Sequence, residues 1–438
     1  MGNAKEVARP QGVLQDPALK EMLQRLRRTD NITNVFYLVR TYLFLAVAIG
    51  VPIWFYHYQL ASGLSWWWNV PIILVAIVLV GAGQHQLAGL VHEAAHHTLL
   101  RHRLLNDLVS DWLCMFPLFS STHHYRLQHL AHHQFVNDPD LDPDVSQLRE
   151  SGHWFSFPLS PRQALWAMLR EAQPLRLLRY IRVRSHYSSM ASPSNPYARK
   201  DGTPSRLPIR AGVAYIIGLA GLLTGLVYVG NAILLATMPW LAWTGMVAFY
   251  ALIPARLYQQ LRLRPVVSIR ALTIGRLTWV TLVFNALAWI TWATGEWAAV
   301  WFLLLWVVPL VTAFSFFMIL RQIVQHGNGG RGWLTNTRIF LVHRFIRFSV
   351  FPVGQDYHLP HHLFSSVPHY RLKALHEALL AYPAYREQAV VVHGYFLPPH
   401  PTVLDVLGPE YTPPASTPAH IDDTVLENEQ VEEEPGAA

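Results

Sequence analysis

The stretch VPIILVAIVLVGAGQHQLAGLVHEAAHH, residues 70–97, decides the fold of this chain. Its apolar part, residues 70–91, contains no Lys, Arg, Asp or Glu, and about 20 apolar residues are enough to cross the hydrocarbon layer as a helix. The run then continues without a break into a histidine-rich end. A helix of about 28 residues is longer than the roughly 30 Å apolar layer is thick, so we expect these histidines on an extension of the helix outside the lipid.

Further apolar runs predict a multi-pass membrane protein. The 438 residues are 52% apolar and only 14% charged, and long uncharged runs are typical of transmembrane helices. Residues 211–255 contain no charged residue and are long enough for a hairpin of two helices. That hairpin crosses twice or not at all, so the sequence predicts an all-α protein with six spans or four. The other predicted spans are residues 35–56, 277–293 and 297–320.

The distribution of Lys and Arg predicts the orientation of the spans, because cytoplasmic loops are enriched in these residues. The N-terminal segment, the long loop 101–210 and the loop 256–276 carry them, whereas the turns between paired spans carry none. We therefore place these loops and the histidine clusters on the cytoplasmic side, and we expect a bacterial inner membrane. The first 34 residues are too long and too charged for the start of a cleavable signal peptide, so we expect none.

The chain divides into six predicted segments. Its formal net charge is +7, but the tail from residue 421 contains seven acidic residues and no Lys or Arg, so the rest carries +14. Most arginines adjoin apolar spans and can meet lipid phosphates, so we expect a membrane and no nucleic acid as partner. The segments are a cytoplasmic N-terminal segment (1–34), a transmembrane hairpin ending in the first histidine cluster (35–97), a cytoplasmic region with the second cluster and an interfacial helix at 161–184 (98–210), transmembrane helices ending at His326 (211–326), a cytoplasmic region with the third cluster (327–420) and an acidic disordered tail (421–438).

Three clusters of histidine predict a metal centre. Residues three or four apart share one face of a helix, so each cluster can aim several ring nitrogens at one point. Neutral imidazole binds iron, copper and zinc, and a site rich in nitrogen without thiolate suits redox iron better than structural zinc. Such clusters can hold two metal ions if an even number of spans separates them. The clusters are His92, His96 and His97; His129, His132 and His133; and His358, His361 and His362.

The clusters and their flanks resemble the three histidine boxes of the membrane fatty acid desaturases and hydroxylases, which have a non-haem di-iron centre. HEAAHH resembles the first box, YRLQHLAHHQFVNDPDLDPD the second and YHLPHHLFSSVPHYRLKALHEAL the third, and the resemblance covers residues 84–396. It implies a cytoplasmic helical cap that holds the di-metal site, with His326 as a further ligand. His97 is either a ligand or a residue that supports one, because the minimal first box needs only His92 and His96.

Other residues near the boxes have predicted supporting roles. Asn137 and Asp138, and Glu93 within the first box, are expected to hydrogen-bond liganding imidazoles, although the aspartates at 138–144 also fit a solvated acidic loop. Pro360 is best tolerated in the first turn of a helix, so we expect a helix to begin there. Gln322 stands where some relatives of the family have an asparagine that reaches the metal through water.

The resemblance implies an oxygen-dependent fatty acid (acyl-lipid) desaturase with two Fe²⁺ ions and O₂ as co-substrate. Cys114 is the only cysteine, so the chain has no iron–sulfur centre of its own. It also lacks a His-Pro-Gly-Gly signature, so we expect a separate electron donor of the ferredoxin or cytochrome b5 type. The alternatives are a di-iron hydroxylase or ketolase acting on a carotenoid or other lipid, a zinc membrane protease that uses HEAAH with Glu93 as base, and a metal transporter.

Overall fold

The computed structural model describes residues 16–190, 195–197, 205–259 and 261–411. The predicted acidic tail, 421–438, lies outside the described residues. Within them, six helices are long and apolar enough to cross a membrane, so the prediction of an all-α chain with six spans is confirmed. The six are Thr33–Ser62 (α2), Trp66–Ala95 (η2 and α3, with α3 at Asn69–Ala95), Leu207–Val229 (α9), Ala232–Leu252 (α10), Ile269–Thr294 (α11) and Ala298–His326 (α12 to α13).

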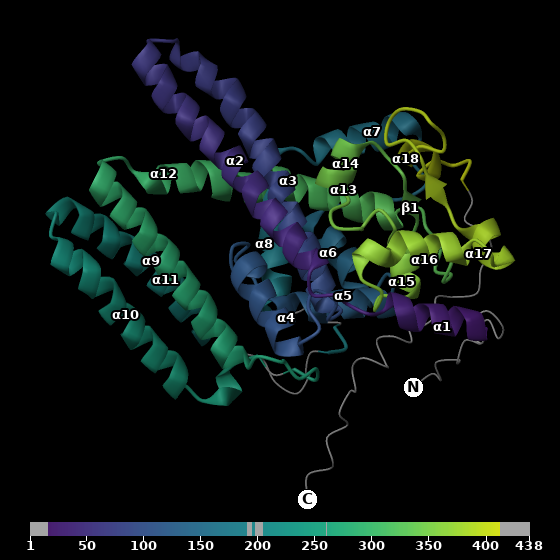
Figure 1. Ribbon diagram of the computed structural model, residues 1–438, viewed down its shortest axis with the longest axis horizontal. Coiled ribbons are helices and arrows are strands. Elements are labelled where there is room, and N and C mark those ends of the chain that lie inside the picture. The colour runs from purple at the N-terminus through teal and green to yellow at the C-terminus, as the bar shows by residue number, and fades with distance from the viewer. Residues whose placement is uncertain (1–15, 191–194, 198–204, 260, 412–438) are drawn as a thin grey trace, which may run out of the picture.

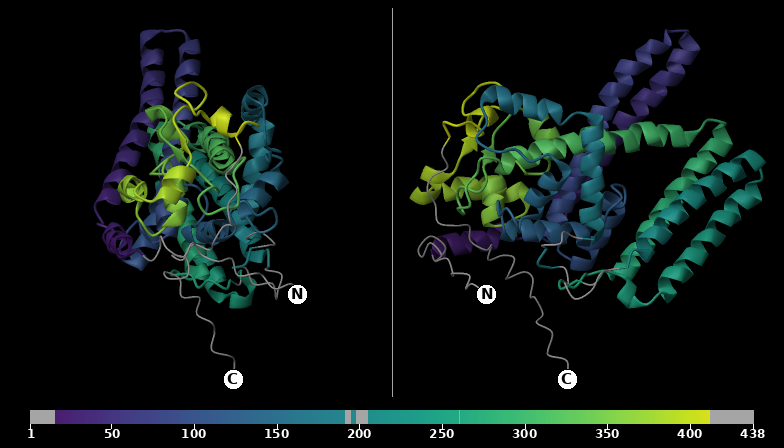
Figure 2. Two further views of the ribbon diagram at one scale, coloured as in Figure 1. Left: turned by 90° about the vertical axis from the view of Figure 1, so that its right-hand side faces the viewer. Right: turned by 180° about the vertical axis from the view of Figure 1, so that it is seen from behind.

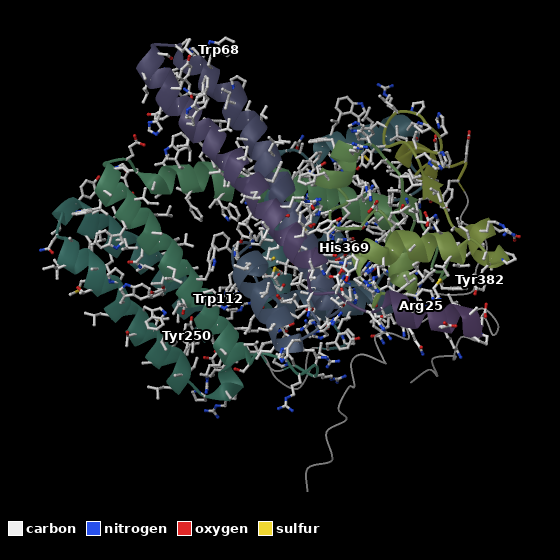
Figure 3. All side chains as sticks on the ribbon, in the orientation of Figure 1. Arg25, Trp68, Trp112, Tyr250, His369 and Tyr382 are labelled. Carbon is white, nitrogen blue, oxygen red and sulfur yellow. The ribbon has the colours of Figure 1, made fainter. Side chains whose placement is uncertain are left out.

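The spans form two groups. The α2–α3 hairpin crosses the last span, whereas α9, α10 and α11 form a separate three-helix bundle beside them (Figure 1). The two groups meet near the turn after α11, where His57 of α2 approaches Glu296 at 3.5 Å. Trp68 lies at the far tip of the hairpin, away from His369 at the opposite end of the spans (Figure 3).

Two glycines allow other helices to approach α3 closely. A Cβ atom on Gly83 would lie 2.5 Å from the Leu45 side chain of α2, and one on Gly81 would lie 2.5 Å from Ala313 in the last span. Small residues at such positions let helix backbones pack tightly in membranes, where dispersion contacts hold helices together. This packing fixes the direction in which the histidine-bearing end of α3 points.

Short helices and one small sheet cover the histidine-bearing ends of α3 and of the last span (Figure 2). The two strands, β1 (Ile339–Phe340) and β2 (Val391–Val392), pair in parallel with Ile339 opposite Val391. The remaining helices are α1 (Pro17–Leu26), α4 (Arg103–Ser110), α5 (Thr122–Gln134), α6 (Pro143–Ser151), α7 (Pro161–Arg170), α8 (Pro174–Met190), α14 (Arg344–Ser349), α15 (His358–Leu363), α16 (Leu372–Leu379), α17 (Pro383–Gln388) and α18 (Val403–Val406).

Two helix boundaries differ from the sequence predictions. The helix predicted at 161–184 is two helices, α7 and α8, because the chain turns before Pro174 and Glu171 forms a buried ion pair there with Arg176 at 2.8 Å. Helix α15 begins at His358, two residues before Pro360. Proline is tolerated at its third position because the N–H groups of the first turn have no partner within the helix. All three histidines of the third box therefore share one helix.

Candidate metal centre

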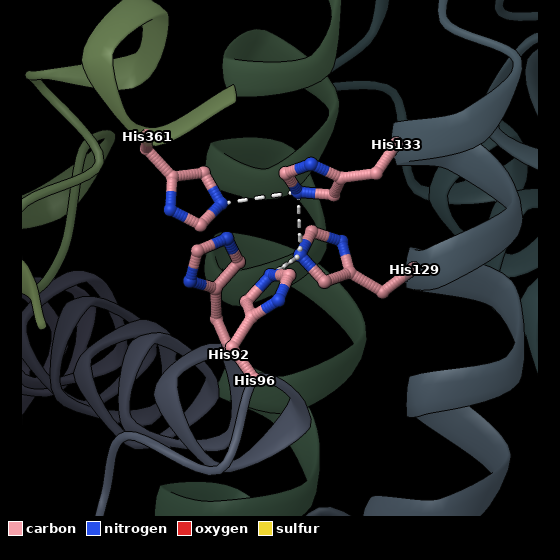
Figure 4. A group of neighbouring side chains, drawn as sticks. All are labelled: His92, His96, His129, His133 and His361. Atoms are coloured by element: carbon pink, nitrogen blue, oxygen red, sulfur yellow. Dashed lines mark hydrogen bonds between the residues drawn. The ribbon is translucent and has the colours of Figure 1, made fainter. Parts of the chain in front are cut away.

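The structure gathers nine of the ten predicted ligands into two neighbouring groups. Within each group the ligand nitrogens lie within 4.8 Å of one another. Figure 4 shows the larger group, in which the imidazoles from α3, α5 and α15 converge. We call them the five-histidine group, which is His92, His96, His129, His133 and His361, and the four-histidine group, which is His132, His326, His358 and His362.

Helical geometry divides adjacent histidines between the groups. His129 and His133 are four residues apart on α5 and enter the five-histidine group together, whereas His132 points into the other group. On α15, His361 joins the five-histidine group and His362 the other. Consecutive residues of a helix lie about 100° apart, so the HH pairs of α5 and α15 each serve both groups.

The spacing of the ring nitrogens in the five-histidine group fits a metal ion. The Nε2 atom of His129 lies 2.8 Å from that of His96 and 3.1 Å from that of His133. For a typical metal–nitrogen distance of about 2.1 Å, neighbouring nitrogens at right angles are about 3.0 Å apart. Neither ring nitrogen of buried His92 has a hydrogen-bond partner among the described residues. Burial lowers the pKa of His96 to about 3, which leaves this imidazole neutral and able to bind a metal.

The four-histidine group has similar spacing and touches its neighbour. The Nε2 atom of His358 lies 3.1 Å from those of both His326 and His362. The rings of His362 and His133 stack with their centroids 4.2 Å apart. The two groups are therefore adjacent and could hold two ions side by side.

Hydrogen bonds outside the groups orient two of these rings. The Nδ1 atom of His132 lies 3.0 and 3.1 Å from the two carboxylate oxygens of Asp142. Burial would lower the pKa of His132, but Asp142 and Asp144 together raise it to about 9. The Nδ1 atom of His326 lies 3.0 Å from the carbonyl oxygen of Asn336, to which it can donate. A partner of this kind on Nδ1 leaves Nε2 directed at the metal and makes the imidazole a stronger ligand.

Asp142 was not singled out from the sequence. Its carboxylate also accepts the backbone N–H of Asn137 at 2.9 Å and caps α6 through the N–H of Asp144 at 2.9 Å. The Asp-Pro pair at the start of a helix is a sequence signal for such a cap. The contact with His132 depends on how α5 and α6 pack, which that signal does not contain.

The three residues predicted to support ligands have different positions. Asn137 donates from its side chain to the carbonyl oxygen of Asn336 at 3.1 Å, and so contacts the peptide that holds His326. The Glu93 carboxylate lies 3.6 Å from Nδ1 of His92. Asp138 pairs instead with Arg331, so the structure does not bring Asp138 to any of the liganding imidazoles.

His97 is the one predicted ligand that the structure leaves outside both groups. It has a positive φ of 57°, just after the end of α3, and its Nδ1 atom lies 3.9 Å from Asp107. Asp107 forms a buried pair with Arg126 at 2.7 Å. Arg126 also donates to the carbonyl oxygens of Ala94 and Ala95, at 2.8 and 2.9 Å, and so caps the end of α3 that carries the first box. The backbone turn directs the His97 ring to this cap.

A match to a family model covers most of the chain. Residues 65–262 and 239–394 match the model described as fatty acid desaturase. The chain belongs to this family. With its six apolar spans it is an integral membrane protein, and the two buried histidine groups lie within the matched part. The resemblance inferred from the boxes is thereby confirmed.

Several desaturases of known name match shorter parts of this desaturase-family chain. A dihydrorhizobitoxine desaturase from Bradyrhizobium elkanii is 30% identical over 28% of this chain and 32% of its own length. An sn-1 oleoyl-lipid 12-desaturase from Anabaena variabilis is 27% identical over 28% of this chain and 35% of its own. A sphingolipid delta(4)-desaturase from Drosophila melanogaster is 29% identical over 20% and 27%. The matches therefore span about a third or less of these relatives, whose names give different substrates.

Proposed function

We propose that this chain is an oxygen-dependent desaturase that introduces a double bond into the acyl chain of a membrane lipid. The observation that supports this proposal is the pair of adjacent, buried, all-histidine groups at the inner ends of membrane-spanning helices. An all-imidazole donor set suits iron, and two ions close together suit the two-electron chemistry of dioxygen. Iron bound there would supply the power to take hydrogen from an unactivated methylene.

The reaction needs electrons that the chain does not carry. Desaturation takes two hydrogens from the substrate and, with O₂, two electrons and two protons, releases two molecules of water. Cys114, the only cysteine of the sequence, is buried. A separate donor of the ferredoxin or cytochrome b5 type is therefore part of the proposal, and it would approach the arginine-rich cytoplasmic face that the loop charges predict.

Side chains of the described residues would position the metal ions and their ligands. The five-histidine and four-histidine groups would hold the two ions. Asp142 and the Asn336 carbonyl orient two of the ligands, and the burial of the rings keeps bulk water from the centre. Gln322 accepts a hydrogen bond from Tyr180 at 2.9 Å and lines the same space as His326. This side chain is placed to contact whatever lies beside the four-histidine group.

The geometry supports iron chemistry better than peptide hydrolysis. In a zinc protease two histidines of HEAAH bind zinc with one further ligand, which leaves a position for water. Here His92 and His96 face three more imidazoles. Glu93 accepts the backbone N–H of His369 at 2.9 Å and the hydroxyl of Thr98 at 3.0 Å, so its carboxylate is engaged in holding the inner end of α3.

Lipid analysis of a host that expresses the chain tests the proposal. The wild type is compared with a His133→Ala, His358→Ala double variant, which removes a ligand from each group, and metal content is measured on purified protein. New unsaturated acyl chains in the wild type alone, with iron bound, would support the proposal. Hydroxylated or keto lipids would replace it with the hydroxylase or ketolase alternative, and a protein that binds one zinc and no iron would overturn it.

A further inference from the structure

A polar cavity opens directly onto both histidine groups. Its volume is about 40 Å³, and five of the histidines, from both groups, line it. About 10–15 Å³ on this measure holds one water, so the space is about three waters in size, and metal ions bound to these histidines would take up part of it. The other residues that line it are Tyr125, Gln128, Asp144, Gln147, Arg184, Tyr187, Ser188, Met318, Arg321, Gln322, Gln325 and Gln355.

This lining is unusual for a space meant to receive the middle of an acyl chain. Among the described residues of the wall, Met318 is the only one without a polar or charged group. Burying a methylene segment against glutamines and arginines would strip water from those groups without replacing their hydrogen bonds. The second cavity beside His132 and His326 has a different wall, which includes Leu148, Phe155 and Phe157.

The unsatisfied groups of the polar cavity are mainly donors. Apart from ring nitrogens of His92 and His358, three buried donor atoms of the described wall have no hydrogen-bond partner, namely Nε of Arg321 and Nε2 of both Gln147 and Gln355. One buried acceptor, Oε1 of Gln128, is also without a partner. Buried polar groups are normally satisfied by protein, water or ligand. An excess of donors over acceptors calls for an occupant that accepts hydrogen bonds.

The charged residues of the wall also favour an anionic occupant. The wall carries two arginines, Arg184 and Arg321, and one carboxylate, Asp144, which faces His132 at 4.0 Å. Arg321 is only 7% exposed; Asp144 interacts favourably with its charge, but no carboxylate of the described residues lies within ion-pair distance of it. A buried guanidinium is costly unless an anion compensates it.

We infer that this polar cavity binds the anionic end of the substrate, with Arg321 and Arg184 as its receptors. The chemistry is that of a compact anion, a carboxylate above all, for which arginine offers paired donors. Because the cavity is small and walled by liganding histidines, the carbon that is oxidised lies near this anionic end. The inference rests on the desaturase reaction proposed above, but it narrows the substrate to a chain with a free anionic end in place of a chain esterified in a membrane lipid.

Ligand binding to the purified full-length chain in nanodiscs tests the inference without turnover. The probes are laurate, methyl laurate, dodecyl phosphate and butyrate, and binding is followed by the shift in melting temperature with concentration. Variants Arg321→Gln and Arg184→Gln remove one charge each. Arg182→Gln is the matched control, because Arg182 is exposed on the same helix as Arg184.

We expect laurate to bind at least about tenfold more tightly than methyl laurate, as expected for a charge-assisted hydrogen bond. Each cavity variant should remove that preference, whereas Arg182→Gln should keep it. Equal binding of butyrate would identify a small carboxylate as the source of the anion, and binding of dodecyl phosphate alone would identify a phosphate headgroup. Equal binding of laurate and its ester, unchanged in Arg321→Gln, would overturn the inference.

Product analysis on the same preparations separates this inference from the proposed function. If the chain forms new double bonds but binds laurate and its ester equally, the desaturase proposal stands and the anion site is ruled out. If the chain prefers anions but holds no iron and forms no product, the anion site stands and the desaturase proposal is ruled out. Arg321→Lys keeps the charge, so partial recovery of laurate binding there would separate loss of the receptor from misfolding.

Discussion

The last span and the α9–α10 hairpin use their surfaces in opposite ways. In the most apolar part of Ala298–His326, 56% of the residues are buried inside the protein, against 22% in α9 and 11% in α10. The last span ends in buried polar residues such as Gln322 and Gln325. The hairpin instead exposes apolar side chains, including Ile217 at 68% and Leu241 at 62%. Lipid can cover such a surface, whereas polar groups in a membrane protein must find partners inside it.

This difference indicates which helices form the candidate metal centre. The helices that carry the ligands bury histidines and amides together at their meeting point, whereas the three-helix bundle of α9 to α11 carries none of the nine grouped histidines. Substitutions of the residues of α3, α5, α13 and α15 that face the two histidine groups should therefore affect metal binding. Substitutions on the lipid-facing side of the bundle should not.

The largest effect is expected from removing a ligand. His361→Ala takes one imidazole from the five-histidine group and His362→Ala one from the other. Each should lower activity by more than about 100-fold, above the range typical of residues that only support ligands, and each should weaken one of the two ions. Activity and metal content measured by mass spectrometry check this. Equal loss of both ions in both variants would show that the two groups are not separate sites.

A smaller effect is expected from the carboxylate behind His132. Asp142→Asn keeps the shape but weakens the charge-assisted contact with the ring. Metal affinity should fall by about 10–100-fold, as measured by competition with a chelator. Asp140→Asn is the control, because Asp140 is exposed on the same loop. Equal losses in the two variants would contradict a specific role for Asp142.

The third prediction concerns Arg126, which caps the end of α3. Arg126→Met removes the cation that pairs with the buried Asp107 and one donor to each of two carbonyl oxygens, although Asn106 still donates to Asp107. Breaking a buried pair by removing one partner typically costs about 3–5 kcal/mol, so the variant should unfold more readily in detergent while its folded fraction still binds metal. Thermal unfolding with metal analysis of the folded protein checks this. A stable variant that has lost its metal would assign Arg126 to the metal centre.

The smallest effect is expected on the bundle. Leu241→Ala removes a side chain that faces outward from α10, and such changes usually alter stability by less than about 0.5 kcal/mol. Leu235→Ala is the matched comparison, because Leu235 on the same helix is fully buried, and it should cost about 2–5 kcal/mol. Thermal unfolding measures both. A large cost for Leu241→Ala would show that a protein surface, rather than lipid, covers that face.

Much of the architecture could be predicted from local sequence. The spans follow from uninterrupted apolar runs, because each residue that faces lipid has to be apolar. The sequence left six or four spans open, and the structure has six helices that are long and apolar enough. The box histidines follow from their spacing, because residues four apart on a helix share a face wherever that helix lies. Helix ends were less certain: the chain turns before Pro174 and α15 begins before Pro360, since proline fits several positions of a first turn.

Only the tertiary structure decided how these local pieces are used. Which group each histidine enters, the exclusion of His97, the contact of Asp142 with His132 and the polar wall around Arg321 all depend on where α3, α5, α13 and α15 cross. Those helices are separated by up to hundreds of residues, so no local spacing encodes their meeting. The sequence by itself determined the spans and the ligand-bearing faces; long-range packing determined which faces meet and what space remains between them.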